Sequence, residues 1–512
     1  MQRSAGNRQV KGARGCGTLD RHHGCGQSGG MIDFRPVANI IGRLTAAFGA
    51  LMAAPMALDI VEGNPTWIAF AQAGAGSILL GAMVGLSTRG SGKSLTLEQA
   101  FLLTSGLWLF LPIIGALPFL LMAHPASVTD ALFESMSGMT TTGATIFPRL
   151  AELSPGLHLW RGLLHWSGGL GIVVIAMLFL PVMKIGGMQF FRSEGFDTMG
   201  KVLPRAGEIA SQITRLYIML TLACTLAFIV AGMPPLIALI HALSTCSTGG
   251  FSTGDLSFGA WLGAPQMVAS VFMVLACLPF VRMVQAARGE FLPIWKDSQV
   301  RTFLAILAIL IGFITVYELV VMQVSQPLVV LREVTFNVIT VVTGTGFAST
   351  DVTQWGHLPF ALLILGALIG GCTGSTSCSI KVFRYQVLWR VIRAQLVQMQ
   401  SPHRVSMPRL DGRRLDAGVI NSVMVFFTLF VLTFGLLIVG LALTGLHPRT
   451  ALTAAWTAIA NVGPVWGPEV SRFGSLEQFP PAAKWLMIAG MYLGRLEILS
   501  VLVLLMPQFW KS

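Results

Sequence analysis

Four short segments of this 512-residue chain carry the residue types that could hold a dehydrated cation. Each combines hydroxyl, amide or small side chains with a glycine, and glycine adopts positive φ at little cost, so that successive carbonyl groups can face one axis. A ring of such carbonyl oxygens can replace the water shell of an ion. The four segments are Thr141, Thr142 and Gly143; Ser247, Thr248 and Gly249; Gly344, Thr345 and Gly346; and Asn461, Val462 and Gly463.

The four segments recur at intervals of roughly one hundred residues, far longer than the repeat of a solenoid. Four similar loops on one chain could therefore complete a ring without oligomerisation. Because glycine allows the backbone of each loop to adopt positive φ, its replacement is expected to turn one carbonyl out of the ring.

A short amphipathic helix is predicted before each loop. At about twelve residues each helix is too short to cross a bilayer, so each helix and loop should form a re-entrant segment. A helix entering from outside would aim its partially negative C-terminus at the membrane centre, where it stabilises a cation. Four interfacial loops between ordinary helices are the alternative, but they do not explain the repeated glycine. The predicted helices are 128–139, 235–246, 329–341 and 449–460.

The composition predicts an integral membrane protein. Hydrophobic residues make up 54% of the chain and charged residues 11%, whereas soluble proteins carry about 25% charged residues. The apolar runs are continuous, which favours helices over the alternating strands of a β-barrel. Ten runs are long enough to span: near 38–58, 66–87, 100–122, 158–183, 213–232, 264–287, 302–323, 357–399, 416–443 and 482–506.

The net charge of +12 is concentrated in particular loops, most of all in residues 384–414. This distribution fits the positive-inside rule and places that segment in the cytoplasm, with no indication of nucleic-acid binding. Asp255, Asp351 and Glu469 follow three of the loops and should lie outside. Acids there could raise the cation concentration at a pore mouth, or could simply be solvated carboxylates.

The fold class predicted from these features is all-α and membrane-embedded, with four pseudo-symmetric helix–loop–helix repeats around one pore. The expected divisions are a tail over 1–30, disordered or wrongly included, a leading transmembrane hairpin over 31–90, and repeats over 91–200, 201–295, 296–405 and 406–512. Cys16, His22, His23 and Cys25 in the tail could bind zinc, but their Gly-rich surroundings favour an unstructured head.

Two features inside apolar runs are candidate gates. Residues 370–379 interrupt the eighth run, which leaves backbone groups unsatisfied unless they face water or protein; a simple kinked helix is the alternative. The gate residues predicted there are Gly370, Gly371, Cys372, Thr373, Gly374, Ser375 and Thr376.

The second candidate is Arg495, which lies too deep to reach either interface and so needs a wet cavity or a partner. The alternative is a structural arginine bonded to helix-end carbonyls or to Glu497. Residues two apart on a helix point away from each other, which disfavours Glu497 as the partner.

These motifs resemble the Trk/Ktr/HKT superfamily of potassium transporters, and most closely its bacterial Trk-type membrane subunit. The resemblance runs from about residue 34 to the C-terminus. It rests on 133–145 (FESMSGMTTTGAT), 247–253 (STGGFST), 345–351 (TGFASTD), 370–376 (GGCTGST), 461–464 (NVGP) and 494–497 (GRLE).

The resemblance implies potassium uptake through a single-chain pore, with K+ bound at the four loops and no cofactor in the chain. It also implies a homodimer in the cell inner membrane and a cytosolic NAD- or ATP-binding regulatory subunit. The intramembrane loop would block the path below the filter, and Arg495 would form an electrostatic barrier. Ser377, Cys378 and Ser379 stand where relatives carry glycines, so this loop could be stiffer.

The resemblance leaves two points open. Proton coupling is undecided. Sodium is the alternative substrate or coupled ion, although the glycine in all four loops favours potassium.

An enzyme is not expected. Gly92, Lys93 and Ser94 imitate the end of a phosphate-binding loop, but that motif needs a glycine at position 87, which is Ser87. Histidines and acids form no convincing catalytic set.

Overall fold

The computed structural model describes residues 32–90, 95–178, 183, 187–188, 190, 206–403, 407–471 and 474–511. The predicted tail over 1–30, its Cys and His residues, and the basic residues of 191–205 lie outside the described residues. Helices dominate the described chain, as predicted, and its strands are the two-residue pair β1 (Arg409–Leu410) and β2 (Arg413–Arg414).

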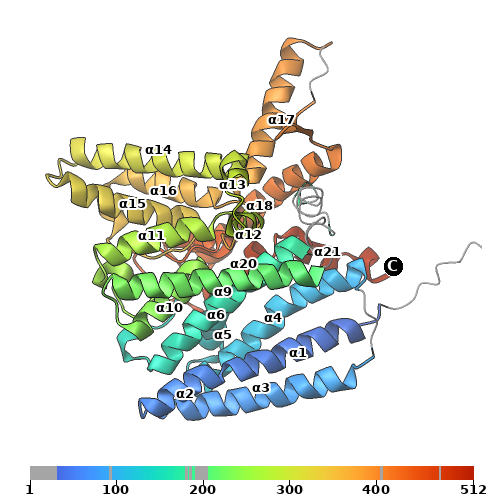
Figure 1. The fold of residues 1–512 in the computed structure, drawn as a ribbon, viewed down its shortest axis with the longest axis vertical. Helices are drawn as coiled ribbons and strands as arrows, with labels where there is room; N and C mark the ends of the chain where they lie inside the picture. The colour runs from blue at the N-terminus through green and yellow to red at the C-terminus, as the bar shows by residue number, and fades with distance from the viewer. Residues whose placement is uncertain are drawn as a thin grey trace, which may run out of the picture.

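The chain begins with a helical hairpin made by α1 (Arg35–Leu51), α2 (Ala53–Val61) and α3 (Trp67–Ser87), which lies along one side of the bundle (Figure 1). Glycines let α1 and α3 approach closely. A Cβ atom at Gly49 would lie 2.8 Å from the carbonyl oxygen of Gly74, and one at Gly42 would lie 2.9 Å from the backbone nitrogen of Gly85. Small residues at such crossings are typical of helices that pack within a membrane.

Four repeats follow, each opening with a long helix and then a short one. Proline at the first position starts three of the short helices, where its missing N–H costs nothing. The long helices are α4 (Leu97–Leu121), α9 (Ala206–Val230), α14 (Ser298–Val320) and α18 (Ala417–Leu443). The short helices are α5 (Val128–Met139), α10 (Pro235–Cys246), α15 (Pro327–Thr343) and α19 (Pro448–Ala460). The third is longer at both ends than the sequence suggested.

The closing helix of each repeat differs from one repeat to the next. In the first repeat it is continuous, as α6 (Pro155–Leu178). In the second, α11 (Ala264–Ala276) and α12 (Phe280–Ala287) meet at 103°. In the third, a non-helical segment separates α16 (His357–Ile369) from α17 (Val382–Gln400). In the fourth, α20 (Pro481–Arg495) and α21 (Leu499–Leu505) meet at 108°.

The prediction of one broken run was therefore incomplete, because three closing helices are broken. Among the described residues, 7 helices are long and apolar enough to cross a membrane, or 9 if each bent pair counts as one span. The eighth predicted run, 357–399, is not among these spans and consists of the short apolar α16 and the polar α17. In Figure 1, α17 projects away from the bundle.

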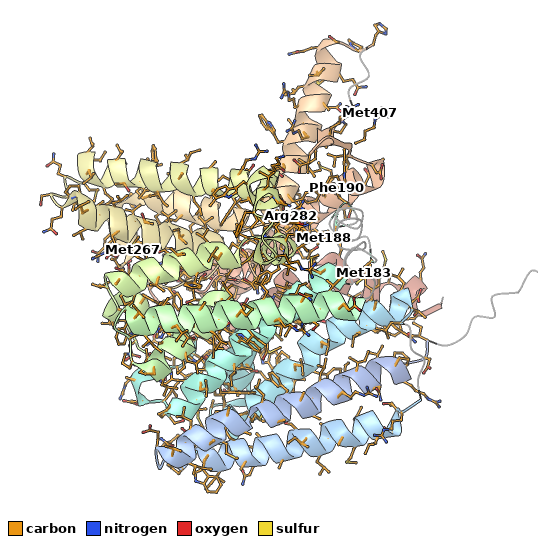
Figure 2. The ribbon with its side chains drawn as sticks, viewed as in Figure 1. Met183, Met188, Phe190, Met267, Arg282 and Met407 are labelled. Carbon is orange, nitrogen blue, oxygen red and sulfur yellow. The ribbon has the colours of Figure 1, made fainter. Side chains whose placement is uncertain are left out.

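Short elements connect these helices: α13 (Leu292–Lys296) and the 3-10 turns η1 (Leu150–Glu152), η2 (Ser257–Ala260), η3 (Val352–Trp355) and η4 (Pro507–Lys511). The Arg282 guanidinium on α12 donates to Asp297, 3.1 Å away, and Asp297 caps the start of α14. Figure 2 labels Arg282 where these segments meet. This ion pair holds the bent second repeat against the third.

Candidate ion filter and the segment beneath it

The four glycine loops meet one another in the order of the sequence, and the fourth meets the first. The contact is so close that any side chain at these glycines would collide with the next loop. A Cβ atom at Gly143 would overlap the carbonyl oxygen of Gly249, and a Cβ atom at Gly250 would overlap the carbonyl oxygen of Thr345. A Cβ atom at Gly346 would lie 2.7 Å from the backbone nitrogen of Gly463. A Cβ atom at Gly463 would lie 3.1 Å from the carbonyl oxygen of Thr142, which returns to the first loop. The four loops therefore enclose one axis.

The backbone conformation repeats from loop to loop. Positive φ falls on alternate residues: 53° and 86° at Thr141 and Gly143, 53° and 84° at Thr248 and Gly250, 83° and 81° at Gly344 and Gly346, and 52° at Asn461. Threonine in this conformation costs about 1–2 kcal/mol, whereas asparagine adopts it more readily. Such strain persists only where the surrounding structure holds it, and it is common at functional sites.

The second loop corrects the register expected from the sequence. The Gly249 amide donates to the Ser244 carbonyl at 2.8 Å, as the Thr142 amide does to the Ser137 carbonyl at 2.9 Å. Gly250, rather than Gly249, therefore occupies the position of Gly143. The equivalent segment is Thr248, Gly249 and Gly250, and Ser247 belongs to the end of α10, where its hydroxyl bonds the Leu243 carbonyl.

Several hydroxyl groups of the ring are already engaged by the protein. Thr142 Oγ1 lies 2.8 Å from Thr140 Oγ1 and accepts from the Asn461 amide at 3.0 Å. Thr345 Oγ1 lies 2.9 Å from Thr343 Oγ1. The Asn461 contact joins the fourth loop to the first, and the other two contacts lie within one loop. With these hydroxyls engaged, the backbone carbonyls are the repeated groups available to an ion.

A wide cavity of about 800 Å³ opens above the ring, on the side predicted to be external. Asp255 and Asp351 line it, together with Arg449. Glu469 does not line it, because its carboxylate accepts from the His447 amide and the Thr450 hydroxyl at the start of α19. Partial desolvation raises the pKa of Glu469, but these hydrogen bonds outweigh it and leave the pKa below its ordinary value.

The non-helical segment 370–381 lies directly beneath the ring and contacts all four repeats. Its residues are buried apart from the half-buried Ser379. The contacts are Cys378 Sγ with Thr141 Oγ1 at 3.7 Å, Thr376 Oγ1 with Thr248 Oγ1 at 3.5 Å, Ser377 Oγ with the Thr343 carbonyl at 2.8 Å, and Ser379 Oγ with the Ala460 carbonyl at 3.2 Å. We call residues 370–381 the sub-filter loop.

The sub-filter loop is anchored on the break between α11 and α12. The Cys372 amide donates to the Cys277 carbonyl at 3.0 Å, and the Phe280 amide donates to the Gly374 carbonyl at 3.0 Å. The backbone N–H and C=O groups that lose their helical partners at one break thus form hydrogen bonds with those at the other break, as buried backbone in a membrane requires. Gly370 and Gly374 have φ of 69° and 77°, and the Thr373 amide donates to Gln299 at 3.0 Å.

The two remaining predicted gate residues of this loop lie on its buried face. Gly371 donates its amide to Ser377 Oγ at 2.9 Å, and Ser375 Oγ donates to the Cys372 carbonyl at 2.6 Å. All seven predicted loop residues therefore belong to one compact turn, not to a kinked helix.

Arg495 ends α20 and reaches the sub-filter loop from the side. Its guanidinium contacts Cys378 Sγ, and it donates to the carbonyls of Thr376 at 3.4 Å and of Gly168 at 3.2 Å. Within the described chain it forms no ion pair, because Glu497 pairs instead with Arg384 at 2.5 Å. The alternative in which Glu497 neutralises Arg495 is wrong, whereas carbonyl groups do accept hydrogen bonds from Arg495, although those of Thr376 and Gly168 do not lie at helix ends. A cation without a carboxylate partner therefore lies below the ring.

The sequence profile of the TrkH family, described as cation transport protein, matches residues 67–512. The chain belongs to the TrkH family. It is 39% identical over 479 residues to the Trk system potassium uptake protein TrkI of Halomonas elongata, covering 93% of this chain and 97% of that protein. It is 32% identical over 487 residues to TrkH of Escherichia coli K12, covering 94% of this chain and all of that protein.

The crystal structure of the potassium transporter TrkH from Vibrio parahaemolyticus has the same fold, with a TM-score of 0.86 at 33% identity over 94% of this chain and 100% of that one. The predicted family and all-α membrane fold are therefore confirmed. A TrkH-family chain is a transport protein and not an enzyme.

Sequence reasoning missed an ion pair that braces the ring of this TrkH-family chain. Arg161 Nε on α6 lies 2.8 Å from Glu134 on α5, and both side chains are at most 1% exposed. Glu134 also accepts from Thr145 Oγ1 at 3.0 Å, and Arg161 donates to the Ser252 carbonyl at 2.9 Å while covering the Phe251 ring. The pair therefore ties the segment after the first loop to the segment after the second.

His165 on α6 performs a similar bracing role. Its Nε2 accepts from the Phe251 amide at 3.3 Å, so Nδ1 carries the proton donated to the Gly138 carbonyl at 2.9 Å. The only sequence signal for His165, Arg161 and Glu134 is the presence of polar residues inside apolar or short amphipathic segments.

Proposed function

We propose that this TrkH-family chain carries potassium into the cell across the inner, cytoplasmic membrane, through the ring formed by its four loops. The observation that supports this is the closed order of contacts from the first loop to the second, third, fourth and back to the first. Carbonyl groups arranged in this way can substitute for the hydration shell of an ion. The relatives described as potassium uptake proteins agree with this proposal.

Potassium is favoured over sodium because backbone carbonyls are the repeated ligands. A sodium-selective ring built of hydroxyl groups would need Thr142 and Thr345 free to face the ion. Both hydroxyls are engaged with neighbouring side chains.

The sub-filter loop and Arg495 are the proposed gate. The loop fills the space under all four repeats, and Arg495 adds an unpaired positive charge beside it. A cation leaving the ring would meet both obstacles. A cytosolic NAD- or ATP-binding regulatory subunit, acting on a homodimer, would move the loop aside.

The test is rubidium tracer uptake into liposomes that contain the purified chain, with potassium or sodium as competitor. Competition by potassium alone is the expected result, and equal competition by sodium would refute selectivity for potassium. Adding the regulatory subunit with its nucleotide should raise the rate. Repeating the assay with an imposed pH gradient determines whether protons are coupled to uptake.

A further inference from the structure

A groove of about 630 Å³ lies outside the pore, between α14, α17 and the β1–β2 hairpin. Gln386 on α17 closes its inner wall by donating to the Ser298 carbonyl at 3.1 Å and to Thr302 Oγ1 at 2.9 Å on α14. In Figure 1, α17 leaves the bundle beside one end of α14. The volume of this groove falls within the range of about 300–1,000 Å³ that is usual for small-molecule sites.

The lining of the groove is divided by polarity along α14. Arg301 lies one turn inside the helix, and Ala305, Ile306 and Ile309 follow on the same side. At 1.5 Å per residue, Ile309 lies about 12 Å deeper than Arg301. Because α14 begins at a basic, cytoplasmic loop, its arginine lies at the level of the lipid headgroups and its isoleucines lie in the hydrocarbon.

Helix α17 supplies the opposite wall with the same division of chemistry. Trp389 is 65% exposed and borders the apolar part, where its ring suits a membrane interface. Arg390 is exposed beside it. Neither Arg390 nor Arg301 has an ion pair within the described chain, and the neighbouring acid, Asp411, accepts from Ser298 at 2.7 Å.

We infer that this groove is a binding site for an anionic phospholipid of the inner leaflet. The two guanidinium groups would bind the phosphate, which guanidinium recognises through paired N–H donors. One acyl chain would lie along Ala305, Ile306 and Ile309 against Trp389. Basic pockets between helices on the cytoplasmic side are suited to anionic headgroups. Since α17 continues directly from the sub-filter loop, a bound lipid would also steady the helix that follows the gate.

Native mass spectrometry of the full purified chain, titrated with phosphatidylglycerol or phosphatidylcholine, tests the inference without any transport measurement. Each arginine near a membrane surface contributes about 1 kcal/mol, so R301Q/R390Q should weaken phosphatidylglycerol binding about thirty-fold. Phosphatidylcholine carries the same phosphate, but its choline cation offsets the phosphate charge, so its binding should weaken much less. The matched control is R393Q, an exposed arginine of α17 outside the groove, which should bind phosphatidylglycerol as the wild type does.

A second variant, A305W, fills the groove without changing its charge and should weaken binding of both lipids. Equal losses in R393Q and in R301Q/R390Q would overturn the inference in favour of diffuse surface charge. Unchanged phosphatidylglycerol binding in both R301Q/R390Q and A305W would also overturn it. A shift from dimer to monomer with no change in lipid binding would assign the groove to a second copy of the chain.

Discussion

Replacing Gly143 by serine is the most direct test of the ring. The glycine has a φ of 86°, and a Cβ atom there would overlap the carbonyl oxygen of Gly249. An L-residue in the left-handed region costs about 1–2 kcal/mol, and the peptide can relieve that strain only by turning a carbonyl out of the ring. If the loss falls on potassium binding alone, the preference for potassium over sodium should drop by about 5- to 30-fold.

Rubidium uptake into liposomes, with sodium as competitor, measures this change directly. G76S is a matched control, because Gly76 lies on α3 and a Cβ atom there meets nothing within 4 Å. The control should keep wild-type selectivity. If G143S folds, conducts and retains the wild-type preference for potassium, Gly143 does not line the filter and the reasoning from the ring fails.

Three further outcomes are expected. R495A should raise potassium flux in the same assay, because it removes the unpaired cation below the ring; a lower flux through folded protein would contradict the barrier. E134Q leaves Arg161 buried and unpaired, which should destabilise the protein by about 3–5 kcal/mol, visible as a lower melting temperature, whereas R149Q breaks only an exposed pair and should change little. Because the pKa of Glu469 is lowered, its contribution to stability is complete above the ordinary value of 4.5 and is lost as the pH falls through the lowered value. Melting temperatures of the wild type and E469Q should therefore converge in acid, and a constant difference across pH would show that the carboxylate contributes nothing by ionising.

Much of the site could be anticipated from sequence because the signals are local. A run of about 20 apolar residues must span a bilayer, and a helix of about twelve cannot. The glycines at 143, 346 and 463 could be picked out from sequence because each follows the end of a short helix within a few residues. The second loop was misplaced by one residue because Gly249 and Gly250 are adjacent, and composition alone permits either register.

The breaks in the closing helices illustrate what sequence patterns hide. In the run over 357–399, the consecutive glycines and hydroxyl residues predict the break. The runs over 264–287 and 482–506 contain no comparable cluster of glycines and hydroxyl residues, yet they bend by 103° and 108°. Their freed backbone groups find partners in other segments, as Cys277 and Phe280 do in the sub-filter loop. Those partners cannot be identified from the sequence of the bent segment alone, because they lie in a different part of the chain.

The sequence by itself determined the membrane environment, the four short helices and the presence of a glycine in the loop after each of them, because bilayer thickness and backbone sterics act on neighbouring residues. Only the tertiary structure decided the register of the ring, the pairing of Arg161 with Glu134, and the pairing of Glu497 with Arg384 rather than with Arg495. Those choices join residues from different segments inside a low-dielectric interior. There, the partner of each charge is set by which helices pack together and not by which residues are adjacent in the chain.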